Sequence, residues 1–76
     1  MSLSLEIEYC VPCAHLDRAI DTQRAILREF GLRINGVRLK PGDRGVFTIR
    51  VDDEQIYDRT QGYDLVGILE DIEARL

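Results

Sequence analysis

The feature that most constrains the fold is a change of hydrophobic period at a pair of cysteines near the start of the chain. Apolar and polar residues alternate through residues 3–9, and this alternation predicts a half-buried strand. Cys10 and Cys13 follow, and apolar residues then recur at helical spacing through residues 14–30. Pro12 suits the first position of a helix, because its missing N–H would have no partner there. The two cysteines are therefore expected where a strand ends and a helix begins.

The rest of the chain predicts three more strands and a second helix. Strand patterns, with alternation or β-branched residues, are found within residues 34–40, 46–51 and 55–58. The connections are assigned to Asn35-Gly36, to the loop Pro41-Gly42-Asp43-Arg44-Gly45 and to the turn Asp52-Asp53. Apolar spacing in residues 65–76 predicts a closing helix, with Asp64 as its N-cap.

The predicted order of elements is β-α-β-β-β-α, within one domain that spans residues 1–76. The first strand–helix–strand unit should cross over right-handed, which makes its two strands parallel. The later strands add an antiparallel hairpin. We therefore expect an α/β fold of thioredoxin-like arrangement, a four-stranded mixed sheet packed with two helices.

Composition excludes several classes of partner. The chain has a formal net charge of −4, and its basic residues are dispersed, so no nucleic acid is expected to bind.

No apolar run is long enough to cross a bilayer, and the first residues lack the pattern of a secretory signal. A cytoplasmic location is the resulting expectation. In a reducing cytosol an isolated pair of cysteines favours a catalytic or redox-sensing role over a permanent structural disulfide.

The chemistry of the cysteine pair is that of a dithiol. Cys10 and Cys13 are the only cysteines, so they cannot form a four-sulfur metal site, and we expect no metal. Haem attachment would need a histidine directly after Cys13, where Ala14 stands. His15 is read as a solvated residue of the first helical turn. Three functions stay open: thiol–disulfide exchange, a redox-switched module for protein binding and, less favoured, a metal or sulfur carrier.

Three segments together resemble a known family. They are residues 7–13 (IEYCVPC), residues 39–50 (LKPGDRGVFTIR) and residues 56–59 (IYDR). In these segments the chain is similar to the selenoprotein W or Rdx family of thioredoxin-like proteins, in a form that has cysteine at position 13. The resemblance implies a small cytoplasmic thiol–disulfide redox protein of cell redox homeostasis. It also implies protein thiols, protein disulfides or glutathione as partners, with glutathione as co-substrate and no resident cofactor.

Two arguments disagree on which sulfur attacks a substrate. The expected place of Cys10 at the helix entrance favours Cys10, because exposure and unpaired backbone N–H groups lower the pKa of a thiol. The resemblance favours Cys13, because some family members carry selenocysteine at that position. The sequence favours Cys10 as the attacking sulfur, with Cys13 as the alternative. Val11, Pro12 and Pro41 are the expected substrate-binding residues, and the sequence leaves the oligomeric state undetermined.

Overall fold

The computed structural model describes residues 3–76, in which four strands form one mixed sheet and two α-helices cover it. The strands are β1 (Leu3–Cys10), β2 (Ile34–Gly42), β3 (Phe47–Val51) and β4 (Glu54–Asp58). The helices are α1 (Leu16–Phe30) and α2 (Leu65–Ala74), with 3₁₀ turns η1 (Gly31–Arg33) and η2 (Arg59–Gln61). This order confirms the predicted α/β fold class.

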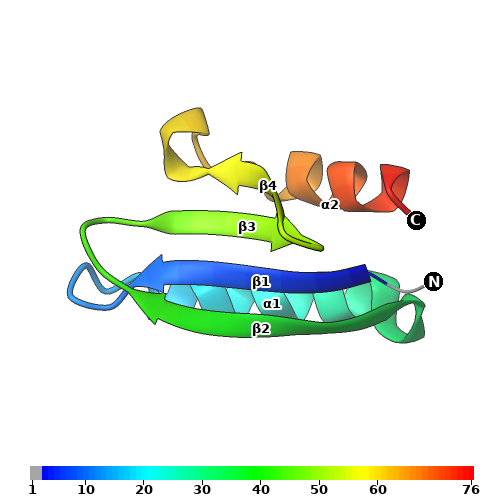
Figure 1. The fold of residues 1–76 in the computed structure, drawn as a ribbon, viewed down its shortest axis with the longest axis horizontal. Helices are drawn as coiled ribbons and strands as arrows, with labels where there is room; N and C mark the ends of the chain where they lie inside the picture. Colours follow the sequence, from blue (N-terminus) through cyan, green and yellow to red (C-terminus); the bar gives the residue numbers. More distant parts are fainter. Residues whose placement is uncertain (1–2) are drawn as a thin grey trace.

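The order of strands in the sheet is β2-β1-β3-β4. β1 runs parallel to β2 and antiparallel to β3, and β3 and β4 form an antiparallel hairpin. Because β1 lies between β2 and β3, the connection from β2 to β3 must cross the end of β1. The turn that follows β1 lies at that same end of the sheet, far from the C-terminus (Figure 1). The topology thus brings residues 11–15 and residues 43–46 together.

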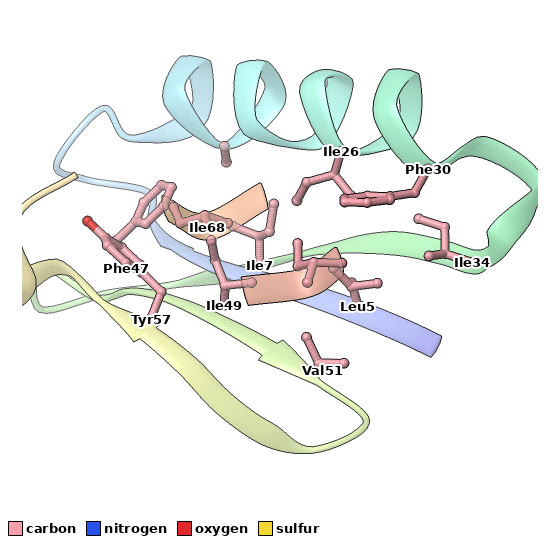
Figure 2. Close-up of a cluster of buried hydrophobic side chains, with 12 residues drawn as sticks. Leu5, Ile7, Ile26, Phe30, Ile34, Phe47, Ile49, Val51, Tyr57 and Ile68 are labelled. Carbon is pink, nitrogen blue, oxygen red and sulfur yellow. The ribbon is translucent and has the colours of Figure 1, made fainter. Parts of the chain in front are cut away.

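A single hydrophobic core lies between the sheet and the two helices. Figure 2 shows Ile26 and Phe30 of α1 above Leu5 and Ile7 of β1, with Ile68 of α2 beside them. The side chains of Leu5 and Ile7 are both buried, and the residues that alternate with them along β1 are more exposed, as the pleat of a strand requires. The alternation read from the sequence was therefore correct for this strand.

The structure corrects two boundaries. The helix α1 begins at Leu16 instead of following Pro12 directly, because Ala14 has a φ of 61° and therefore cannot belong to a right-handed helix. The strand β2 begins at Ile34 and includes both Asn35-Gly36 and Pro41-Gly42, which the sequence had assigned to connections. Pro41 is tolerated there because β2 is an edge strand, so one side of its backbone needs no partner within the sheet.

The hairpin between β3 and β4 turns on two aspartates, as predicted. Asp52 and Asp53 have φ angles of 48° and 73°, the left-handed conformation that a two-residue type I′ turn requires at both positions. Asp52 is also fixed to the start of β1. Its N–H donates to the Ser4 carbonyl at 2.9 Å, and its carboxylate accepts from the Ser4 N–H at 3.0 Å. No such side-chain contact is found for Asp53 within residues 3–76.

Asp53→Gly is therefore expected to stabilise the protein. Glycine adopts a positive φ without the steric cost that an L side chain meets, so the free energy of unfolding should rise by about 0.5–1 kcal/mol. Thermal unfolding should show a midpoint a few degrees higher, at roughly 4–8 °C per kcal/mol for a domain of this size. Asp52→Gly is the matched control. It should raise the free energy of unfolding by less, because it also removes the contact with Ser4. A lower midpoint for Asp53→Gly than for the wild type would contradict this reading of the turn.

A hydrogen bond between Thr22 and Tyr63 ties α1 to the segment before α2. Thr22 is fully buried, and its hydroxyl donates to the Arg18 carbonyl at 2.7 Å. The same oxygen lies 2.7 Å from the Tyr63 hydroxyl. Since the only proton of the Thr22 hydroxyl is used on Arg18, the Tyr63 hydroxyl must be the donor in the second bond.

Tyr63→Phe should lower the free energy of unfolding by about 1 kcal/mol, the usual net contribution of such a hydrogen bond. The ring itself is kept, so packing should change little. Urea unfolding of Tyr63→Phe, Thr22→Val and the double variant would isolate the bond as a coupling energy. Strictly additive effects of the two substitutions would show that the bond contributes nothing.

Candidate functional site

Cys10 and Cys13 are joined by a disulfide that closes a tight turn between β1 and α1. Their Cα atoms are 5.3 Å apart, within the range that a disulfide needs. The Ala14 N–H donates to the Val11 carbonyl at 3.1 Å, which places Pro12 at the second position of a turn. Proline is favoured at that position because its fixed φ matches the turn. Pro12 thus shapes the disulfide loop and does not begin the helix.

The two sulfurs differ in their access to solvent. Cys10 ends β1 and is fully buried, with 0% of its surface exposed, whereas Cys13 is an exposed residue of the turn. Val11, between them, is 53% exposed. Cys10 is therefore neither exposed nor part of a helix entrance, so the two positional reasons for preferring it as the attacking sulfur are absent.

The loop between β2 and β3 covers Cys10. The Gly45 N–H donates to the Cys10 Sγ at 3.2 Å, and Gly45 has a φ of 74°. On the other side of this residue, the Arg59 Nη1 donates to the Gly45 carbonyl at 3.1 Å. The buried sulfur thus has a main-chain donor, which would favour a negative charge on Cys10 when the disulfide opens.

His15 differs from its expected role. It lies half-buried directly before α1, and its ring packs edge-on against Phe47, with the ring centroids 6.0 Å apart. Its Nδ1 is buried and has no hydrogen-bond partner within residues 3–76. The expectation of a solvated histidine was therefore wrong. Within residues 3–76, no group of three or more His, Cys, Asp or Glu side chains could hold a metal ion.

The structure brings the three expected substrate-binding residues to the same end of the sheet. Val11 and Pro12 are exposed beside Cys13, and the Val11 N–H donates to the Gly42 carbonyl at 3.0 Å. Pro41, also exposed, directly precedes Gly42. Their role in binding a substrate stays a prediction.

Sequence reasoning missed Gly45 and Arg59 as parts of the site. Gly45 could have been found from topology alone, because the connection between β2 and β3 has to cross the end of β1. Arg59 lies in one of the segments that resemble the Rdx family, but no pattern gave it a role beside the cysteines, because it comes from the 3₁₀ turn η2 far along the chain.

Comparison with known proteins identifies the family. The sequence model of the Rdx family matches residues 4–70. The chain belongs to the Rdx family. No curated protein matches this Rdx chain at a significant level.

Two solved structures are similar to this Rdx protein over almost the whole chain. A protein from Bordetella parapertussis superposes with a TM-score of 0.94 at 28% identity, covering 100% of both chains. A selenoprotein W-related protein from Vibrio cholerae superposes with a TM-score of 0.92 at 25% identity, covering 97% of this chain and 96% of the other. The family and the disulfide are consistent with a redox role. None of the helices within residues 3–76 has the length and apolar character needed to cross a membrane.

Proposed function

We propose that this Rdx protein exchanges thiols and disulfides with protein or glutathione substrates in the cytoplasm, as part of cell redox homeostasis. One observation carries the proposal: the Cys10–Cys13 disulfide has one sulfur buried under a main-chain donor and the other exposed. An exchange reaction needs one sulfur that a substrate can reach and a second that can leave and return. The pair has one exposed and one buried sulfur in a single turn, which supports this assignment of the two roles.

In the proposed reaction Cys13 exchanges with the substrate and Cys10 is the resolving sulfur. A substrate thiolate attacks the Cys13 Sγ, the Cys10–Cys13 bond breaks, and Cys10 leaves as a thiolate facing the Gly45 N–H. A second substrate thiolate then attacks the mixed disulfide at the substrate sulfur, which releases the Cys13 thiolate. Two substrate thiols become one disulfide, and two electrons and two protons pass to the protein. The reverse sequence reduces a substrate disulfide.

Titration in buffers of reduced and oxidised glutathione tests the exchange directly. The Cys10–Cys13 disulfide should open and close reversibly. Its midpoint potential can be measured by alkylating the free thiols at each ratio and determining the mass of the protein by mass spectrometry. Resistance of the disulfide to reduction in the folded protein, or its failure to form again, would rule out dithiol exchange.

A second candidate is a redox-switched module for protein binding, and the apolar surface around the motif favours it. Val11 is 53% exposed and Leu16 is 44% exposed, on either side of Cys13. Opening the disulfide would free the turn that contains Val11 and precedes Leu16 of α1, and would change the surface a partner meets. A partner that binds one oxidation state without exchanging electrons would distinguish this function from catalysis.

A further inference from the structure

A cavity of about 210 Å³ lies beside the redox site. Its wall contains two arginines, one histidine and three aromatic residues: Arg18, Arg59, His15, Phe47, Tyr57 and Tyr63. No carboxylate from residues 3–76 lines it, although the whole chain has 14 acidic residues and only 10 basic ones. Among the described residues, the charged side chains that line this cavity are thus all basic, in a protein that is acidic as a whole.

Both arginines in the wall have N–H groups available. The Arg18 guanidinium lies 4.6 Å from the centre of the Tyr63 ring, and the Arg59 guanidinium donates to the Gly45 carbonyl through one nitrogen. Neither arginine forms an ion pair with a carboxylate of residues 3–76. A guanidinium has five N–H donors in a planar fork that matches a carboxylate, so each retains donors for a bound anion.

The aromatic part of the wall adds a further donor. Phe47 and Tyr57 pack edge to face, with centroids 6.1 Å apart. Burial raises the pKa of the Tyr57 phenol above its ordinary value, although the nearby Arg18 charge acts in the opposite direction. Tyr57 therefore keeps its proton at neutral pH and presents an O–H donor. The His15 imidazole, with its buried and unpartnered Nδ1, is a further polar group in this wall.

The cavity is connected to Cys10 through Gly45, and its adjoining groove comes within one residue of Cys13. Arg59 in its wall holds Gly45, whose N–H contacts the Cys10 Sγ. An adjoining groove shares His15 and Arg18 with the cavity and extends to Ala14, the neighbour of Cys13. A ligand seated in the cavity can therefore extend toward the exposed sulfur.

The groove and the cavity differ in charge. Asp17 and Asp21 line the groove together with Arg18, whereas the cavity has no acidic residue among those described. An anionic group is therefore favoured inside the cavity and not along the groove, where Asp17 would repel it and Asp21 is already paired with Arg24 at 3.2 Å.

We propose that this cavity binds a carboxylate of the thiol or disulfide substrate, so that the protein reacts faster with carboxylate-bearing thiols than with neutral thiols of the same size. The inference rests on the proposed exchange function and adds a chemical class of substrate to it. The Arg18 and Arg59 guanidinium groups would bind the carboxylate while the substrate sulfur reaches Cys13.

The test compares two thiols of equal size, 3-mercaptopropionate and 3-mercaptopropionamide, as reductants of the oxidised protein. The ratio of their rates is measured for the wild type, Arg18→Gln, Arg59→Gln and the control Arg28→Gln. Arg28 is exposed on α1 and lies outside the cavity, and its substitution changes the net charge equally. Comparing ratios between variants cancels the intrinsic difference in reactivity between the two thiols.

Arg18→Gln and Arg59→Gln should each lower the carboxylate-to-amide ratio by about fivefold or more, as expected for losing a charged hydrogen bond. Arg28→Gln should leave the ratio unchanged, and Arg59→Lys should restore part of it. Equal ratios in the two cavity variants and in Arg28→Gln would overturn the proposal.

Binding of propionate gives a second readout that does not depend on electron transfer. In an NMR titration of the oxidised protein, the backbone signals of Arg18, Arg59 and Tyr63 should shift in a saturable way, and this response should weaken in Arg59→Gln. If neither thiol reduces the disulfide, the exchange function fails, and propionate binding still decides whether the cavity holds a carboxylate. Absence of saturable shifts in the wild type would exclude the site.

Discussion

Cys10→Ser should accumulate a stable mixed disulfide through Cys13, whereas Cys13→Ser should accumulate little or none. The reason is the difference in access: Cys10 is fully buried beneath the loop that contains Gly45, and Cys13 lies on the exposed turn. A buried thiol reacts only when its surroundings open locally, so the rate of adduct formation should be lower by on the order of 100-fold in Cys13→Ser. Incubation of each reduced variant with oxidised glutathione, followed by mass spectrometry over time, measures the two rates.

The double variant Cys10→Ser/Cys13→Ser controls for reaction elsewhere, because the chain has no other cysteine. A thermal melt of each variant should be recorded as well, since partial unfolding would expose the remaining thiol and remove the difference. Faster adduct formation by folded Cys13→Ser would identify Cys10 as the exchanging sulfur. The original preference for Cys10, based on its expected place at the helix entrance, would then be correct.

Gly45→Ala should slow reduction of the disulfide and destabilise the fold. An L side chain at the φ of 74° costs about 1–2 kcal/mol, which corresponds to a melting point lower by roughly 5–15 °C. The new Cβ would also lie 2.7 Å from the Arg59 Nη1, so Arg59 must move away from the loop. Any shift of the Gly45 N–H weakens its hydrogen bond to the departing Cys10 thiolate. Because a hydrogen bond to a charged group contributes enough for about a tenfold change, the rate of reduction should fall by about tenfold. Stopped-flow reduction with a small thiol measures this effect.

Gly62→Ala is the matched control for Gly45→Ala. Gly62 has a φ of 77°, and a Cβ there would meet no atom within 4 Å. It therefore also places an L side chain at a positive φ and should lose stability, without the change in reduction rate. Equal reduction rates for both variants and the wild type would mean that the Gly45 N–H does not stabilise Cys10.

Much of the fold could be predicted because single segments carry strong local signals. The alternation along β1, the helical spacing of α1 and the Asp64 cap of α2 all correspond to the observed elements. The start of α1 could not be predicted, since the turn is closed by the disulfide and by a left-handed Ala14, a conformation that alanine rarely adopts. The true extent of β2 was missed because its pairing with β1 overrides the turn preference of Asn35-Gly36.

The site was only partly visible in the sequence. The spacing of Cys10 and Cys13 was sufficient to predict a dithiol, because its chemistry depends on two adjacent sulfurs. Which sulfur is buried depends on the loop that contains Gly45, 35 residues from Cys10 in the sequence. No local pattern predicts a contact between segments so far apart. The same holds for the cavity, because Arg18 of α1 and Arg59 of η2 line the same wall although they are far apart in the sequence.

The donor to the Cys10 sulfur belongs to the main chain, and this has a consequence for how the protein can evolve. Every residue except proline has an amide N–H, so substitutions at Asp43, Arg44 and Val46 leave the donor in place provided that the loop keeps its path. The electrostatic support of the sulfur is then conserved by the shape of the chain and not by the chemistry of a side chain. In the proposed reaction, the hydrogen bond to the resolving sulfur of Cys10 therefore does not depend on the side chains around the exposed sulfur of Cys13.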